Sequence, residues 1–596
     1  MLLNEVKETI SEYLISEFDI ENPDFDVLPA AKPEDGDFYT NAALKHQKIT
    51  SKGPLYLAEV LANLFAKNEN FSTKIAKPGF VNFYLNNQFL EDSLSSAHKV
   101  EMTNVGKNAV IEYVSPNTNK PLHIGHIRNS ALAISLINIL SKSGYLVKKA
   151  IVYNNRGLHI TKSMWGYLLL GCTKAGVTAS SDWKNIIKIW SAGGKDWLTP
   201  SIMAEGRLNK PDHFIGHFYV LANEFVDKNK KVEEDWQQML LAWENKNDPM
   251  HDLVRELWSF VNNYFYTGYE ESAKDFEFRF DARYISYESN IYGSGKETIL
   301  EGVKKGLFEK VKGGAIEADL SDFSLPNKIL VRSDGTGIYM TFDVELTRQR
   351  TQLKSDLLIW VVGSDQNLYF KQLFAVSQLL GLGSGSKFIH YSYGMVRVPG
   401  GKMSSRDGTV VYADDMLTLV KSEIKNIMEK SSIGKESGLE DIENTVHDIA
   451  LGALKWSMIS NEPVKDIAFD LAKTVSFTGF SGPYVQYTHA RCFSVLDKAR
   501  FKLNKNKDIS LDSEDIIIAR TLFGFTEQVN MATKELAPHY ICHYLFDLCQ
   551  TFNSYYANTK IIGSKNEYSK LVLTSATKEV IKTGLSLLGI SAPEKM

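Results

Sequence analysis

The hydrophobic positions along this chain change their spacing several times, and each change marks a different kind of predicted element. Residues 3–14 and 57–64 place hydrophobic side chains three and four positions apart, which predicts two amphipathic helices. Residues 79–85, GFVNFYL, alternate in the manner of a strand. We therefore predict a small, separate α+β domain over residues 1–105.

After this domain the pattern becomes strand, helix, strand. Residues 109–114 read AVIEYV, residues 127–140 have helical spacing, and residues 147–153 read VKKAIVY. This order is typical of a βαβ unit and predicts a Rossmann-like, parallel, nucleotide-binding sheet. The segment of about 165–270 is rich in Trp and charge and lacks strand alternation, so we predict a helical insertion there.

Strand character returns at residues 328–333 and 357–363, and a helical pattern over 364–381 then leads into a strand predicted over 388–398. These elements complete a predicted catalytic domain over residues 106–415. The chain is long enough for several domains.

The remainder is helical in pattern. We predict a helical connector over residues 416–475 and an all-helical domain over residues 476–596. Aromatic and basic residues alternate in SGPYVQYTHAR and in YYANTK. Such mixing suits stacking and phosphate contact with RNA, although aromatic stripes at helical spacing more often belong to a core.

Composition narrows the class of protein without choosing a function. Hydrophobic residues make up 44% and charged residues 23%, as in soluble globular proteins. No apolar run is long enough for a bilayer, so we expect a cytosolic protein without a membrane partner. The four cysteines form no CxxC pair, and neither a disulfide framework nor a protein-bound metal is expected.

Candidate chemistry first appears in SPNTNKPLHIGHIRNS, residues 115–130. This loop joins a predicted strand to a predicted helix, and a helix N-terminus offers unpaired N–H groups to an anion such as phosphate. His123 and His126 add donors, and Gly125 removes a side chain that would hold a nucleotide away. One HxGH tetrapeptide alone would equally fit a capped core helix with surface histidines.

A second segment, GGKMSSRDGTVV at residues 400–411, is rich in hydrogen-bond donors, although by itself it also fits an ordinary polar hairpin. HxGH and KMSS occur at the first and last crossovers of the split βαβ pattern, separated by the long insertion. This pairing resembles the class I aminoacyl-tRNA synthetases. The loop pattern SPNxxKxLHxGHxR narrows the resemblance to the arginyl-tRNA synthetase family.

Further segments resemble that family in the expected order along nearly the whole chain. They are GDFYTNAAL, PGFVNFYL, TGIYMTFDVE, VVGSDQNLYFKQLF, SGPYVQYTHAR and LSLLGISAPEKM. The resemblance implies activation of L-arginine with ATP and Mg²⁺, transfer to tRNA(Arg), a monomer, and activation that requires bound tRNA. It further implies that residues 1–105 contact the tRNA elbow, that residues 416–475 contact its stem, and that residues 476–596 bind the anticodon.

The resemblance also assigns roles to individual residues. Catalytic roles fall to Lys120, His123, His126 and Lys402. ATP-binding roles fall to His123, Gly125, His126, Gly363, Asp365, Lys402, Ser404 and Ser405. Arginine-binding roles fall to Ser115, Asn117, His126, Tyr339, Asp343 and Gln366, and tRNA-binding roles to Tyr484, Gln486, Tyr487, Arg491 and Met596.

Elementary chemistry supports the predicted arginine pocket. A guanidinium is planar and always charged, so its pocket needs a carboxylate and benefits from an aromatic face. Tyr339 and Asp343 stand four positions apart and share a face if their segment is helical. Glu112 is a candidate further acid, although a strand carboxylate without a role fits almost as well.

One position departs from the wider class. Many class I loops read KMSK, whereas the fourth position here is Ser405, followed by Arg406. In arginyl-tRNA synthetases without that lysine, a lysine before HxGH is thought to substitute for it, and Lys120 occupies the matching place.

Three rival functions stay open at this point. A class I synthetase for another amino acid would share both motifs, but the Tyr339 and Asp343 pair favours a cationic substrate. A catalytically silent, tRNA-binding relative would have lost the histidines, the loop lysine or the pocket carboxylate, and all of these are present. A smaller HxGH nucleotidyltransferase would not need the C-terminal 120 or so residues.

Overall fold

The computed structural model describes residues 2–30, 33–49, 52–174, 182–203, 206–226, 231–398, 411–430, 439–504 and 507–596. Two compact units make up the chain. One contains Met1–Asn104, Met428–Gly452 and Ser476–Met596, and the other contains Val105–Ile427 and Ala453–Val475. The second unit carries the HxGH segment and is described first.

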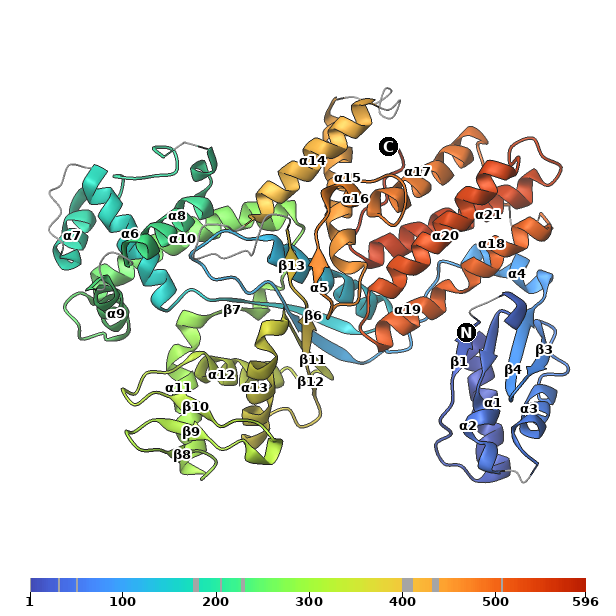
Figure 1. Ribbon diagram of the computed structural model, residues 1–596, viewed down its shortest axis with the longest axis horizontal. Coiled ribbons are helices and arrows are strands. Elements are labelled where there is room, and N and C mark those ends of the chain that lie inside the picture. The colour runs from blue at the N-terminus through green and yellow to red at the C-terminus, as the bar shows by residue number, and fades with distance from the viewer. Residues whose placement is uncertain are drawn as a thin grey trace. The chain divides into compact units, whose positions relative to one another are not determined.

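A five-stranded parallel sheet forms the centre of this unit (Figure 1). Its order is β12–β11–β5–β6–β7, and every neighbouring pair is parallel. The strands span Asn108–Glu112 (β5), Leu146–Tyr153 (β6), Ile285–Tyr287 (β7), Leu357–Gly363 (β11) and Lys387–Tyr393 (β12). The predicted Rossmann-like parallel sheet is therefore confirmed.

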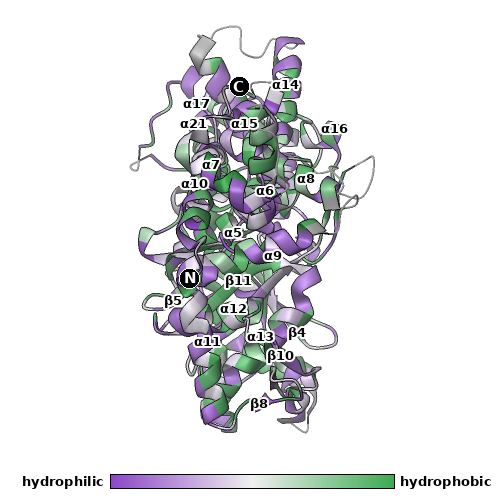
Figure 2. Ribbon diagram, turned by 90° about the vertical axis from the view of Figure 1, so that its left-hand side faces the viewer, coloured by the Kyte–Doolittle hydropathy of each residue, from purple (hydrophilic) through white to green (hydrophobic). Residues whose placement is uncertain are grey.

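Helices cover both faces of the sheet. Alternate strand residues, among them Val110, Leu358 and Trp360, pack in one cluster with α12 (Tyr339–Thr351) and α13 (Asn367–Leu379). Helix α5 (Ile124–Lys142) contacts β6 and β11, and most of its residues are buried. Figure 2 shows hydrophobic, green residues around the α5 and β11 labels. Burial on this scale explains why α5 has no clear polar face in its sequence.

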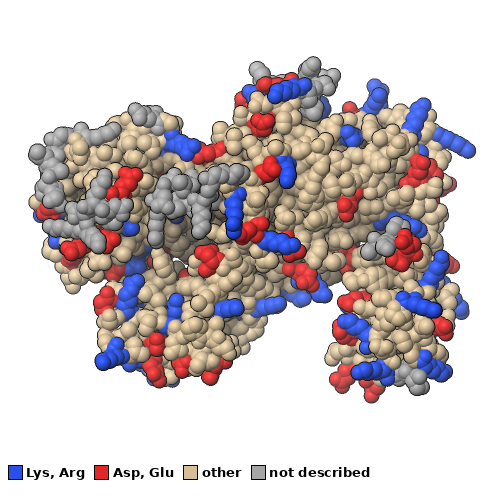
Figure 3. Space-filling model, in the orientation of Figure 1, with Lys and Arg blue, Asp and Glu red and all other residues tan. Residues whose placement is uncertain are grey.

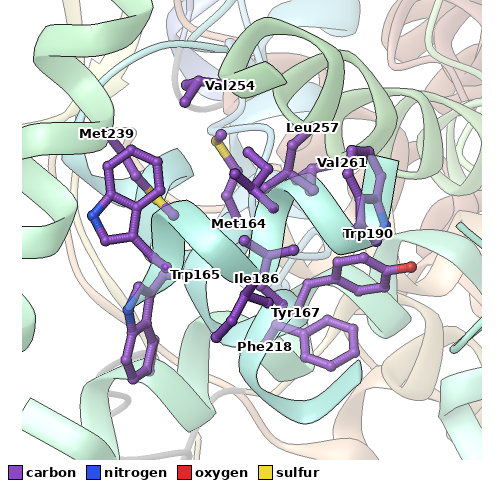
Figure 4. Close-up of a cluster of buried hydrophobic side chains, with 14 of the residues drawn as sticks. Met164, Trp165, Tyr167, Ile186, Trp190, Phe218, Met239, Val254, Leu257 and Val261 are labelled. Atoms are coloured by element: carbon purple, nitrogen blue, oxygen red, sulfur yellow. The ribbon is translucent and has the colours of Figure 1, made fainter. Parts of the chain in front are cut away.

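The predicted insertion is helical and has a core of its own (Figure 4). Its helices are α6 (Leu158–Lys174), α7 (Trp183–Ile189), α8 (Pro211–Val226), α9 (Lys231–Glu244) and α10 (His251–Asp275). Tyr167 of α6, Phe218 of α8 and Val261 of α10 meet in this core, and Trp190 is completely buried there. Aromatic side chains bury large areas, so the Trp-rich composition of this segment reflects packing.

Elements after the insertion extend the unit. Helix α11 (Glu288–Lys304) packs on α12, and β8 (Glu309–Lys310), β9 (Ile316–Ala318) and β10 (Lys328–Val331) form a separate antiparallel sheet. Helix α14 (Ala413–Lys430) follows the segment that carries the KMSS motif. Part of α15 (Leu439–Ile459) also belongs here, together with α16 (Leu471–Thr474).

The strand predicted over residues 388–398 is wrong in its second half. Strand β12 ends at Tyr393, and a short β13 (Val396–Arg397) pairs with β14 (Ile467–Ala468) outside the main sheet. Arg128 causes the separation: its completely buried guanidinium donates hydrogen bonds to the carbonyls of Gly394 and Met395 at 2.7 and 3.3 Å. It also binds the carbonyls of Pro463 and Lys465 at 2.9 and 2.7 Å.

The other unit combines a small α+β domain with a helical bundle. The α+β part has an antiparallel sheet, in the order β1–β2–β4–β3, and its strands span Val27–Pro29, Phe38–Thr40, Phe80–Leu85 and Phe71–Ala76. Its helices are α1 (Leu2–Phe18), α2 (Ala42–Lys45), α3 (Pro54–Asn63) and α4 (Asn87–Ser93). The bundle contains α17 (Gly482–Lys498), α18 (Ser513–Phe523), α19 (Phe525–Lys534), α20 (His539–Asn558) and α21 (Glu567–Leu587).

Candidate active site

The sheet changes its winding direction beside β5, because β6 follows β5 on one side while β11 lies on the other. In open α/β sheets, ligands bind at such a point, in the crevice beyond the carboxyl ends of the strands. There the backbone turns sharply at Val114 and Ser115, which have positive φ angles of 65° and 36°. A β-branched residue with a positive φ is an outlier, and outliers of this kind cluster at functional sites.

Specific hydrogen bonds hold this turn in place. The Val114 N–H donates to Asn129 Oδ1 at 2.7 Å, and Asn129 in turn donates to the Val361 carbonyl of β11 at 2.6 Å. The Ser115 hydroxyl accepts from the Val152 N–H at 3.2 Å. Loop 115–123 is therefore fixed to both neighbouring strands before it enters α5.

The two histidines cap the N-terminus of α5. The Gly125 N–H donates to His123 Nδ1 at 3.1 Å, and the His123 N–H donates to His126 Nδ1 at 3.1 Å. Both Nδ1 atoms act as acceptors, so each neutral ring carries its proton on Nε2. Each imidazole therefore has an N–H that can donate to an anion at a helix end that already favours negative charge.

Burial keeps these imidazoles neutral. Desolvation, together with the nearby Lys120 ammonium, lowers the pKa of His123 to about 4. The pKa of His126 lies well below its ordinary value, for the same reason and through its proximity to His123 and Lys120. Desolvation also lowers the pKa of Lys120. A phosphate would thus meet neutral imidazole donors and one half-buried ammonium.

Gly125 has a second role besides leaving room for a ligand. A Cβ at this position would stand 2.9 Å from His123 Cε1 and 3.0 Å from His123 Nδ1. An alanine would therefore push the capping ring out of place.

A second set of side chains gathers around α12. Tyr339 is its first residue and is 59% exposed, and Asp343 follows one turn later on the same face. The segment is helical, which is the condition under which the sequence placed the two side chains on one face. Asp343 accepts a hydrogen bond from the Tyr369 hydroxyl, and desolvation raises the pKa of Asp343 to about 7.

Two further carboxylates lie near Asp343. Glu112 ends β5, and Glu288 opens α11 directly after β7. Glu112 is 3.6 Å from Arg350, and Glu288 is 3.6 Å from Arg156. Among the residues that the structure describes, no lysine or arginine forms an ion pair with Asp343. Asp343 is thus the carboxylate of this group whose charge is open to an incoming cation.

Sequence reasoning missed Glu288 and its surroundings. Glu288 is 4% exposed, desolvation raises its pKa to about 8, and its Oε2 has no hydrogen-bond partner within the described part of the chain. Arg156 also binds Glu244 of α9, and its guanidinium lies 3.7 Å from the ring centroid of Tyr292. The sequence signal that could have identified Glu288 is an acidic residue directly after a strand. Strand β7 has only three residues, however, so its hydrophobic pattern in the sequence is weak.

The remaining predicted contacts at this edge are placed as follows. Gly363 ends β11, where a Cβ would stand 2.7 Å from Asp365 Oδ1. Gln366 donates to Asp365 Oδ2 at 2.7 Å, and both side chains are exposed. Asn117 is half-buried, and its backbone forms an isolated parallel β-bridge with Asn154, which follows β6. Lys402, Ser404 and Ser405 lie outside the described residues.

The predicted tRNA contacts lie in the helical bundle of the other unit. The Arg491 guanidinium lies 4.9 Å from the ring centroid of Tyr487 and 5.3 Å from that of Tyr556, and Asn553 bonds both Arg491 and the Tyr484 hydroxyl. This group forms a small aromatic and basic cluster on α17 and α20.

Gln486 does not belong to that cluster. It is completely buried, and its Nε2 donates to the carbonyls of Asp448 and Ser591 at 3.2 and 3.0 Å. Its side-chain amide is therefore engaged inside the protein. Met596 is half-buried at the end of the chain. Figure 3 shows basic and acidic side chains interspersed on the face in view, as a net charge of −4 predicts.

Comparison with known families accounts for most of the chain. The family described as tRNA synthetases class I (R), catalytic domain, matches residues 89–158 and 204–471. The arginyl-tRNA synthetase N-terminal domain matches residues 2–85, and the DALR anticodon binding domain matches residues 485–596. Fold and matches together define a class I tRNA synthetase.

Relatives narrow this class. The arginine–tRNA ligase of Bacteroides fragilis strain YCH46 is 34% identical over 594 residues, with 92% of each chain covered. The arginine–tRNA ligase of Borrelia hermsii strain HS1 is 34% identical, with 89% of this chain and 88% of the relative covered. The chain belongs to the arginyl-tRNA synthetase family.

Solved structures share the fold. Thermus thermophilus arginyl-tRNA synthetase matches all of both chains with a TM-score of 0.79 and 23% identity. The Plasmodium falciparum enzyme matches all of this chain and 99% of its own, with a TM-score of 0.76 and 18% identity. Among the described helices, none is both long and apolar enough to cross a membrane.

The capping geometry predicts the protonation state of His123. With a pKa near 4 and Nδ1 engaged, the ring should stay neutral from pH 7 to pH 5 and carry its proton on Nε2. ¹⁵N NMR of histidine-labelled protein, with the signal assigned through His123→Asn, measures both properties. A titration centred near pH 6.5, or a proton on Nδ1, would contradict this geometry.

Proposed function

We propose that this chain is an arginine–tRNA ligase. It would join the carboxylate of L-arginine to the α-phosphorus of ATP, release pyrophosphate, and then transfer the arginyl group from AMP to the 3′ end of tRNA(Arg). One observation carries this proposal: a helix N-terminus that suits phosphate and the Asp343 carboxylate, which has no ion pair among the described residues, lie at the same edge of one parallel sheet.

The phosphate end of the site works by position and charge. The attack builds negative charge on oxygens around phosphorus, and preorganised donors stabilise it without moving. His123 and His126 would supply Nε2–H donors, and Lys120 would supply the cation that the KMSS loop lacks at Ser405. Mg²⁺ would arrive with ATP, and Lys402, Ser404 and Ser405 would close on pyrophosphate. Gly363 and Asp365 would hold the ribose.

The pocket end selects the amino acid. Asp343 would bind the substrate guanidinium while Tyr339 covers its flat face, and Glu288 Oε2 offers a further acceptor. Ser115, Asn117 and Gln366 would hold the rest of the amino acid, with His126 near its carboxylate. Arg156 and Arg350 already lie 3.6 Å from Glu288 and Glu112, so Asp343 is the carboxylate of this group, within the described residues, that is left to pair with an additional cation.

The regions outside the catalytic domain would bind tRNA. The enzyme would act as a monomer. We assign the anticodon to residues 476–596, where Tyr484, Tyr487 and Arg491 present aromatic rings and charge. Residues 1–105 would contact the tRNA elbow, and residues 416–475 would contact the stem.

Charging assays test the activity directly. Total tRNA is incubated with ATP, Mg²⁺, the protein and each of the twenty amino acids in turn, and only arginine should become attached. Attachment of a different amino acid would assign the chain another substrate. Attachment of none, by folded protein, would indicate a silent tRNA-binding relative.

The raised pKa of Asp343 predicts a pH dependence. Only the ionised carboxylate attracts a guanidinium, and burial raises the pKa of Asp343 to about 7, so kcat/KM for arginine should fall about tenfold per pH unit below pH 7. Asp343→Asn should lower kcat/KM at pH 8 by about 100-fold or more and remove this slope. Parallel pH profiles for the wild type and the variant would contradict the role of Asp343.

The proposed role of Lys120 predicts a loss of turnover with little loss of ATP binding. Lys120→Ala removes one contact to the developing phosphate charge and should lower kcat by about 30- to 1,000-fold, the rate equivalent of about 2–4 kcal/mol. The KM for ATP should change only a few-fold. Lys142→Ala, at the exposed C-terminal end of α5, is the matched control. Near-normal turnover of Lys120→Ala would refute the assignment.

A further inference from the structure

A partly buried ion-pair network joins the helical insertion to the first turn of α14. Lys210, directly before α8, places its Nζ 2.6 Å from Asp414 Oδ2, and His213 Nε2 is 3.0 Å from the same oxygen. Ser272 of α10 accepts from Lys210 Nζ at 2.5 Å and donates to Asp414 Oδ1 at 3.0 Å. One carboxylate therefore receives hydrogen bonds from two insertion helices and the residue that precedes α8.

The charges of this network are balanced by its own side chains. Burial alone would raise the pKa of Asp414, but the hydrogen bonds from His213 and Lys210 outweigh burial and hold it at about 2. Asp212, His213 and Asp414 come close enough together to hold a metal ion. The Lys210 ammonium, however, already lies 2.6 Å from Asp414 and 3.6 Å from Asp212. This cluster is therefore an internal ion pair with its own cation.

The residues just before Asp414 touch the HxGH segment. The Ile124 N–H donates to the Val411 carbonyl at 3.1 Å, and the Ala413 N–H donates to the Leu122 carbonyl at 2.9 Å. His123 and Tyr412 face each other in this short antiparallel pairing, and the Tyr412 ring also packs 4.8 Å from the His213 ring. Holding Asp414 in place thus holds the backbone on both sides of His123.

The same insertion helices also brace the lysine loop. At Gly216 of α8, a Cβ would stand 2.6 Å from Pro121 Cδ and 3.4 Å from Lys120 Cα. Asn262 of α10 accepts a hydrogen bond from Thr118 at 2.5 Å. The insertion therefore contacts the loop before the histidines and, through Asp414, the segment paired with them.

We propose that the Lys210–His213–Ser272–Asp414 network is a positioning device for the phosphate end of the active site. The insertion would use it to set the distance between Lys120 and the capped N-terminus of α5. These residues touch no substrate; they act through Val411–Ala413 and through loop 118–121. The inference rests on the proposed function, because it assigns the network an effect on the step that Lys120 and His123 perform.

The test compares two neighbouring carboxylates in the full-length protein. Asp414→Asn keeps the shape and removes the charge, and kcat for arginine charging should fall 10- to 100-fold, since a misplacement of about 1 Å costs a factor of that size. The KM for arginine should stay within twofold. Asp415→Asn makes the same chemical change one residue later, in a partly exposed pair with Arg207, and should leave kcat unchanged.

A second pair of variants keeps the test decisive if Asp414→Asn folds poorly. His213→Phe keeps a ring against Tyr412 but loses the donor, and it should reproduce the loss of kcat. His213→Gln restores a donor at the Nε2 position and should recover kcat to within about threefold of wild type. A purely structural role would instead lower kcat, arginine affinity and the thermal unfolding midpoint together, with no rescue by Gln.

Two results would overturn the inference. One is a joint loss of kcat, arginine affinity and thermal unfolding midpoint without rescue by His213→Gln, and the other is a wild-type kcat in both Asp414→Asn and His213→Phe. Failure of the proposed function is distinguishable from this result, because the wild-type protein itself would then charge no arginine.

Discussion

The active site depends on how the N-terminus of α5 is held. This helix end must expose its free N–H groups to a ligand, and yet it lies within the most buried helix of the parallel-sheet unit. His126 Nδ1 accepts the His123 N–H and His123 Nδ1 accepts the Gly125 N–H, which leaves the Nε2–H of each neutral ring available to a ligand. Backbone pairing with Val411–Ala413 then fixes the chain on both sides of the cap.

At the opposite end of the site, the three carboxylates differ in whether the chain supplies a cation beside them. Glu112 and Glu288 each have an arginine of the chain beside them, whereas Asp343 has only the Tyr369 hydroxyl. Burial raises the pKa of all three carboxylates, and that of Asp343 reaches about 7; Asp343 is the one of the three that has no lysine or arginine beside it among the described residues. A bound guanidinium would relieve the cost of burying its charge, so the pocket is poised for a cationic side chain.

Local patterns were sufficient to predict the parallel sheet and the helical insertion, because strand and helix periodicities are read within short windows, whereas the roles of Tyr339 and Asp343 came from the family resemblance. Long-range packing was not predictable in this way. Arg128 divides a predicted strand by binding carbonyls near Pro463, Glu288 follows a strand of three residues, and Gln486 is buried by contacts to Asp448 and Ser591. Each of these outcomes depends on partners far away in the sequence.

A crystal structure with a non-hydrolysable arginyl-adenylate analogue would test the central claim most directly, because it locates both ends of the site at once. The account predicts the phosphate within hydrogen-bond distance of the His123 and His126 Nε2 atoms, and the guanidinium paired with Asp343 beneath Tyr339. A guanidinium bound away from Asp343, or a phosphate away from the N-terminus of α5, would contradict it.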